Sequence, residues 1–81
     1  MTLIDEIKGI LGSVSIVDET KIEPKSTLRT DLGIDSFGTM DIVVKIEKKY
    51  GVKIIDKQIH RFVTVQDVVS YVQENAALAK E

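Results

Sequence analysis

The first part of the chain places its apolar residues on one face of a helix. These residues are Leu3, Ile4, Ile7, Ile10, Leu11 and Val14. Their spacing follows the repeat of three and four positions that is typical of an amphipathic helix. Thr2 can accept a hydrogen bond from a free N–H at the start, and Asp5 and Glu6 stand in the first turn, where the helix dipole favours acids. The pattern predicts a helix over residues 2–14, with Gly12-Ser13 as an alternative end.

Residues 15–35 have no sustained hydrophobic period. Pro24 restricts the backbone of Glu23 and disfavours a helix there. A structureless stretch of about 20 residues is uncommon inside a compact domain, and where it occurs it is often functional. We expect its apolar residues to hold it on the core. These are Ile22, Leu28, Leu32 and Ile34.

Three further helical segments follow. Residues 36–50 form a second helix, with Asp35 or Ser36 as its N-cap and Gly51 just past its end. Residues 56–61 allow one short helical turn, anchored by the apolar side chains of Ile59 and Phe62.

The last helix is predicted over residues 65–77, with Thr64 as its cap. Residues 63–71 also alternate as a strand would, and valine favours strands. The helix is preferred because the chain offers no convincing partner strand. We expect one all-α domain over residues 1–81 with a frayed tail at 77–81.

The second helix carries apolar residues on both of its sides. One side holds Ile42, Val43, Ile46 and Tyr50. The opposite side holds Phe37, Met40 and Val44, flanked by Asp41, Glu47 and Lys48. A surface helix of a small bundle needs only one apolar stripe. The second side is therefore either covered by the long loop or offered to a partner protein.

Composition narrows the class of protein. The 81 residues carry a net charge of −2, which disfavours nucleic-acid binding. No apolar run approaches the roughly 20 residues of a membrane span, and the absence of cysteine fits a reducing compartment.

His60 is the only histidine and is expected to be exposed; alone it makes neither a metal site nor a catalytic base. We expect no enzyme, no metal and no membrane span.

Ser36 stands at the positive end of the second helix, where backbone N–H groups favour a phosphate. It is either a simple N-cap or the bearer of an anionic group. The surrounding run is Asp31-Leu32-Gly33-Ile34-Asp35-Ser36-Phe37. This run, with Ile46 to Ile54 and Thr64 to Val72, resembles the acyl carrier protein family over nearly the whole chain.

The resemblance implies a four-helix bundle with a long first loop and a short third helix. It implies that Ser36 takes 4′-phosphopantetheine through a phosphodiester and that Asp35 helps the modifying transferase and its Mg²⁺. The arm would supply the thiol that this chain lacks, and would present acyl thioesters to fatty-acid, lipid or polyketide enzymes. Partner recognition would fall on Phe37, Met40, Asp41, Val44, Glu47 and Lys48. The partners expected are a phosphopantetheinyl transferase and acyl-transfer and synthase enzymes. The protein is expected to be a monomer located in the cytoplasm.

The chain departs from the family pattern in its charges and at one site position. Phe37 replaces the usual Leu, and residues 35–39 also look like those of D-alanyl carriers, whereas residues 31–33 have the acyl-carrier form. Residues 36–50 carry net +1, although this helix is strongly acidic in fatty-acid carriers. We expect a specialised carrier. An aminoacyl or peptidyl carrier, and an unmodified helical interaction module, remain as alternatives.

Overall fold

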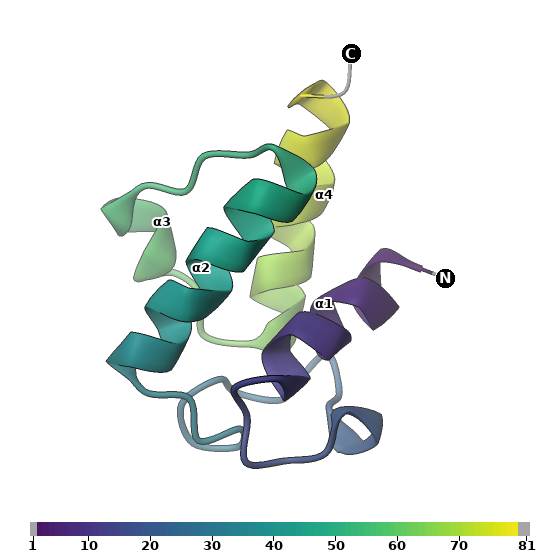
Figure 1. The fold of residues 1–81 in the computed structure, drawn as a ribbon, viewed down its shortest axis with the longest axis vertical. Helices are drawn as coiled ribbons and strands as arrows, with labels where there is room; N and C mark the ends of the chain where they lie inside the picture. The colour runs from purple at the N-terminus through teal and green to yellow at the C-terminus, as the bar shows by residue number, and fades with distance from the viewer. Residues whose placement is uncertain (1, 80–81) are drawn as a thin grey trace.

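The computed structural model describes residues 2–79, with side chains through Asn75. Its elements are α1 (Leu3–Gly12), a 3-10 turn η1 (Glu19–Lys21), α2 (Ser36–Tyr50), α3 (Asp56–Ile59) and α4 (Val65–Ala79). Helices α1, α2 and α4 pack together, the short α3 lies to one side of α2, and the long loop closes the lower end of the bundle (Figure 1). The predicted four-helix architecture is confirmed, and none of the described helices is long and apolar enough to cross a membrane.

Local hydrogen bonds mark where the helices begin and end. At α1 the Thr2 side chain accepts the N–H of Asp5, and the helix ends at Gly12, two residues before the predicted end. Gly51 ends α2 with a left-handed φ of 67°, a conformation that favours glycine. The predicted helix ends thus hold to within about two residues, the usual uncertainty of such boundaries.

At α4, Thr64 and Asp67 form a reciprocal capping box. The Asp67 N–H donates to Thr64 Oγ1 at 3.2 Å, and the Thr64 N–H donates to Asp67 Oδ2 at 2.9 Å. The strand alternative for this segment is wrong. The helix runs to Ala79 rather than ending at 77; residues 80–81 and the side chains from 76 onward lie outside the described part, so fraying of the tail stays a prediction.

The core is aliphatic except for Phe62, and it includes residues of the long loop. The loop residues Ile22, Leu28, Leu32 and Ile34 are all buried, as predicted. Backbone hydrogen bonds join this loop to the start of α4: the Leu28 N–H donates to Val63 O at 2.9 Å, and the Val65 N–H donates to Ser26 O at 3.0 Å. The segment is therefore fixed in place although it has little regular structure of its own.

One edge of α2 is locked to α1 by polar contacts. The Tyr50 hydroxyl donates to Glu6 Oε1 at 2.8 Å, and Lys49 Nζ lies 3.8 Å from the same oxygen. Burial, together with the hydrogen bond to the Glu6 carboxylate, raises the pKa of Tyr50 well above its usual value. These contacts join the C-terminal end of α2 to α1, while the buried Ile42, Val43 and Ile46 determine which side of α2 faces the core.

Candidate functional site

The start of α2 presents an exposed serine that does not cap its helix. Asp35 is the N-cap, and its Oδ1 accepts the Gly38 N–H at 2.9 Å. Ser36 is the first residue of the helix, and its hydroxyl makes no hydrogen bond to the backbone of residues 2–79 or to the side chains described through residue 75. The alternative that Ser36 is the N-cap is therefore wrong, because Asp35 satisfies that role. The Ser36 hydroxyl is left free at the positive end of the helix.

The turn before α2 aims these two residues outward. Ile34 is buried, and its N–H donates to Leu28 O at 2.9 Å. Gly33 has φ 65°, and a Cβ added there would lie 2.9 Å from Ile16 Cδ1. A Cβ on Gly38 would lie 2.9 Å from Ile34 Cγ2. A glycine on each side of the serine thus lets the turn pack closely, while Asp35 and Ser36 stay exposed.

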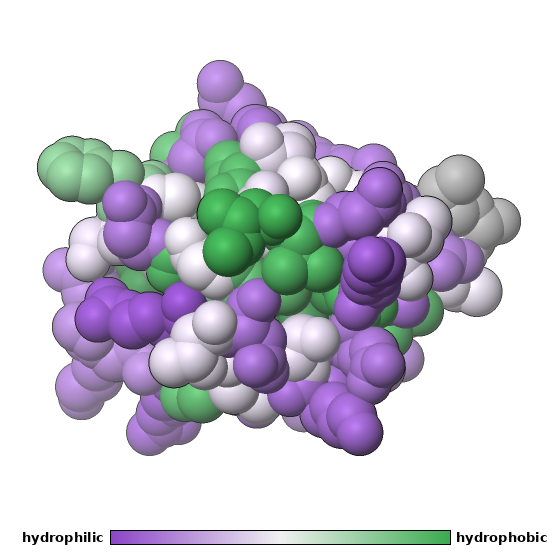
Figure 2. All heavy atoms as spheres, turned by 90° about the horizontal axis from the view of Figure 1, so that it is seen from below, coloured by the Kyte–Doolittle hydropathy of each residue, from purple (hydrophilic) through white to green (hydrophobic). Residues whose placement is uncertain are grey.

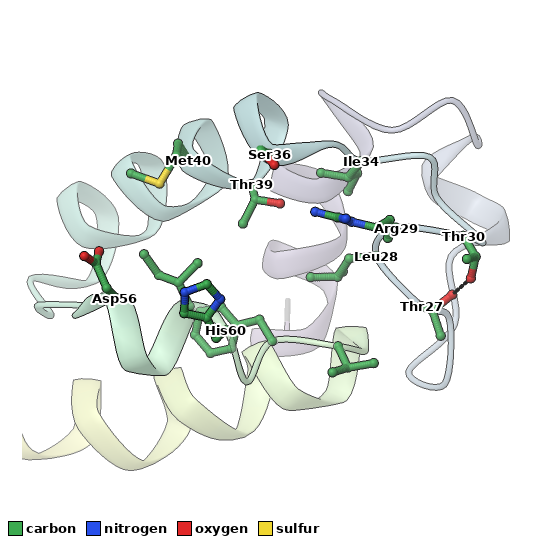
Figure 3. Close-up of a pocket in the computed structure, with 13 residues that line it drawn as sticks. Thr27, Leu28, Arg29, Thr30, Ile34, Ser36, Thr39, Met40, Asp56 and His60 are labelled. Carbon is green, nitrogen blue, oxygen red and sulfur yellow. Dashed lines mark hydrogen bonds between the residues drawn. The ribbon is translucent and has the colours of Figure 1, made fainter.

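A cavity of about 530 Å³ lies beside Ser36, between α2, α3 and the long loop (Figure 3). Ser36, Thr39 and Met40 of α2 line one wall, and Asp56 and His60 lie across from them. Its other lining side chains are mainly apolar and include Leu28, Ile34, Ile59, Phe62 and Val63. A ligand attached at Ser36 would therefore begin at the edge of this cavity.

The second apolar side of α2 is open to solvent. Phe37 is 88% exposed, Met40 50% and Val44 42%, whereas Ile42 and Ile46 on the opposite side are buried. The long loop does not cover these residues, so of the two alternatives for this side only the exposed one holds. Seen from the loop end of the bundle, the surface also carries a small hydrophobic cluster among mostly hydrophilic residues (Figure 2).

Most charged side chains along α2 are already engaged within the chain. Lys45 Nζ lies 3.4 Å from Asp41 Oδ2 and donates to Ser13 Oγ. Glu47 is half-buried, and its Oε2 accepts the Ile54 N–H at 2.9 Å. Lys48 forms no ion pair among the described residues. The partner role predicted for Asp41 and Glu47 stays a prediction, and Lys48 is the least engaged charge on this side.

Sequence reasoning missed the groups that surround the cavity. His60 is exposed as predicted, but it also lines the cavity together with Asp56 and Arg29. The sequence pattern did not indicate a site role for Arg29, because this residue lies in a segment without hydrophobic periodicity. Only the packing of α3 and the long loop against α2 brings these residues to the serine.

Comparisons with known proteins agree with this arrangement. The family model described as phosphopantetheine attachment site matches residues 3–72. Acyl carrier proteins of Helicobacter pylori (strain G27) and Phytoplasma australiense are each 33% identical over 75 residues, which is 93% of this chain and 96% and 99% of theirs. The solved acyl carrier protein of Enterococcus faecalis shares the fold, with a TM-score of 0.77, 22% identity and coverage of 90% of this chain and 92% of that one.

The fold and the family match define a carrier domain that bears a covalently attached 4′-phosphopantetheine. The chain belongs to the acyl carrier protein family. This membership supports the interpretation as an acyl carrier protein over that of an unmodified interaction module. The start of α2 fits such a group: the first turn holds no acidic residue, and its N–H groups and dipole favour a phosphate.

Proposed function

We propose that Ser36 carries the 4′-phosphopantetheine arm and that the chain transports acyl groups on it. The observation that carries this proposal is the free, exposed Ser36 hydroxyl beside an N-cap that Asp35 already supplies. When attached, the group supplies a thiol that holds acyl groups as thioesters. The chain itself has no cysteine, so it depends on the arm for that chemistry.

The protein's own residues orient and shelter the arm. Asp35 fixes the first turn of α2 and, beside the reacting hydroxyl, is available to the transferase and its Mg²⁺. The apolar part of the cavity favours hydrocarbon, since each buried CH₂ group contributes roughly 0.8 kcal/mol. Cargo lying there is shielded from water between visits to enzymes. Tethering also raises its local concentration at a docked enzyme.

We infer that the chain acts as a monomer in the cytoplasm and catalyses no reaction itself. Its partners are a phosphopantetheinyl transferase and acyl-transfer and synthase enzymes. They approach along α2, where Phe37, Met40 and Val44 offer exposed apolar surface next to Ser36. Such a surface, apolar at its centre and polar at its rim, suits a transient protein contact.

Peptide mapping tests the site directly. The chain is incubated with coenzyme A, Mg²⁺ and a broad-specificity phosphopantetheinyl transferase, and its intact mass is measured. We expect the mass of one phosphopantetheine to be added, and fragmentation of the modified peptide to localise it to Ser36. Modification at another serine or threonine would contradict the proposal. So would the absence of any modification under conditions in which the same transferase modifies a known carrier.

The cation on the exposed side of α2 favours dedicated partners. An enzyme that docks carriers through Arg and Lys would be repelled by Lys48. We expect Lys48→Glu to raise the rate of acyl transfer by such an enzyme, up to about tenfold at low salt, through faster association. The measurement is the initial transfer rate at two ionic strengths. Lys21→Glu, on the exposed η1 turn, makes the same change in net charge; an equal gain for both variants would refute the role of Lys48.

A further inference from the structure

Arg29 lies beside the serine from a part of the chain that the proposed function does not use. It contributes to the main cavity and also to a second hollow of about 240 Å³, whose other walls are Gly33, Ile34, Asp35 and Ser36. In Figure 3 its guanidinium points from the long loop toward Thr39 and the start of α2. One arginine thus borders both hollows that adjoin the Ser36 hydroxyl.

The backbone on both sides of Arg29 is fixed, so its position beside Ser36 is built into the fold. Leu28 is buried, its N–H donates to Val63 O, and its carbonyl accepts the Ile34 N–H. The pairing of Leu28 with Ile34 sets Arg29 next to the residues that lead into α2. The following turn is closed by the Thr27 N–H, which donates to Asp31 Oδ2 at 2.8 Å.

The charges around Arg29 leave its guanidinium available. Among the side chains that the structure describes, those of residues 2–75, the Arg29 guanidinium forms no ion pair and no hydrogen bond. Two carboxylates close to Arg29 in the chain each accept a backbone N–H, Asp31 from Thr27 and Asp35 from Gly38, and neither forms an ion pair with it. A phosphodiester on Ser36 adds a second negative charge next to Asp35. A neighbouring cation would offset the repulsion between them.

We propose that Arg29 is the counter-ion of the arm's phosphodiester and holds the first part of the arm over the cavity. This inference rests on attachment at Ser36. Guanidinium suits the task, because its planar donors bind phosphate oxygens in pairs and it stays charged at any physiological pH. Arg29 is a positioning residue: it restrains the arm and takes no part in the chemistry at the thiol.

The test compares three phosphopantetheinylated variants with the unaltered holo-protein by NMR. Arg29→Gln removes the charge, Arg29→Lys keeps it without the paired donors, and Arg61→Gln is the matched control at an exposed arginine that lines neither hollow. The readouts are the ³¹P shift of the phosphodiester, the Arg29 side-chain N–H signal before and after modification, and the relaxation of the arm's methyl groups.

We expect the Arg29 N–H signal to shift on modification. We expect Arg29→Gln to lower the population of the restrained arm about two- to fivefold, the range that an exposed charge pair supplies. Arg29→Lys should fall between, and Arg61→Gln should match the unaltered protein. Raising the salt concentration to about 1 M shortens the screening length to about 3 Å. In the unaltered protein this should lower the population of the restrained arm almost as much as Arg29→Gln does.

Two results would overturn the role of Arg29. One is an arm that moves equally in the unaltered protein and in Arg29→Gln; the other is a ³¹P shift and arm motion insensitive to salt. Failure of the underlying function would be seen in the mass measurement that precedes the NMR experiment. The intact mass would not change, or peptide mapping would place the arm at another residue. The two failures are therefore separated before any spectrum is recorded.

Discussion

Ser36→Ala should abolish attachment of phosphopantetheine and leave the fold as stable as before. The loss is complete, because alanine offers no oxygen for the phosphodiester. Stability should change by no more than about 0.5 kcal/mol, since the Ser36 hydroxyl makes no bond among the described residues and alanine is the better helix former. Intact mass after transferase treatment and urea unfolding followed by circular dichroism measure the two effects.

Substitutions at Asp35 separate capping from modification. Asp35→Ala removes the acceptor of the Gly38 N–H and should cost about 1 kcal/mol of unfolding free energy. Asp35→Asn keeps a side-chain oxygen for this N–H but removes the charge. It should unfold almost like the unaltered protein while being modified more slowly. Two results would contradict this division of roles. One is a Ser36→Ala protein that still gains an arm, and the other is a Ser36→Ala protein that unfolds as easily as Asp35→Ala.

The separate roles of Asp35 as the N-cap and Ser36 as the attachment residue could be predicted only in part from the sequence. An Asp-Ser pair before a helical pattern predicts a cap but leaves open which residue provides it, since both residue types are strong N-caps. Hydrogen-bond geometry decides it: the Asp35 carboxylate reaches the Gly38 N–H. The motif of residues 31–37 indicated the chemistry through its resemblance to a family. The free hydroxyl is a property of the folded turn.

Periodicity predicted the three long helices well because each has one face that the core buries, whereas the short α3 has no buried residue. It identified both sides of α2, yet it left open whether the loop covered the side with Phe37 and Met40, because contacts between distant segments are not encoded in local spacing. The cavity escaped prediction for the same reason. Arg29, Asp56 and His60 line one cavity only because the loop and α3 fold against α2.

Ile46→Ala should be among the most destabilising single changes on α2. Ile46 is completely buried on the core side of the helix. Truncating a buried isoleucine typically costs 2–5 kcal/mol, from lost burial and from the cavity left behind, so we expect about that loss here. Native domains have a total of only about 5–15 kcal/mol, and a small domain has a thin core. Each kcal/mol lowers the Tm of a domain of this size by roughly 4–8 °C, so a drop of at least about 8 °C is expected in a thermal melt.

Val44→Ala is the matched control, because it truncates a branched residue on the exposed side of the same helix. Val44 is 42% exposed, and alanine has the higher helix propensity, so its unfolding free energy should change by less than about 0.5 kcal/mol. The same variant trims the proposed partner surface, so it should slow transfer by partner enzymes without lowering the Tm. Equal destabilisation by the two variants would mean that the two sides of α2 are not divided into a core side and a contact surface.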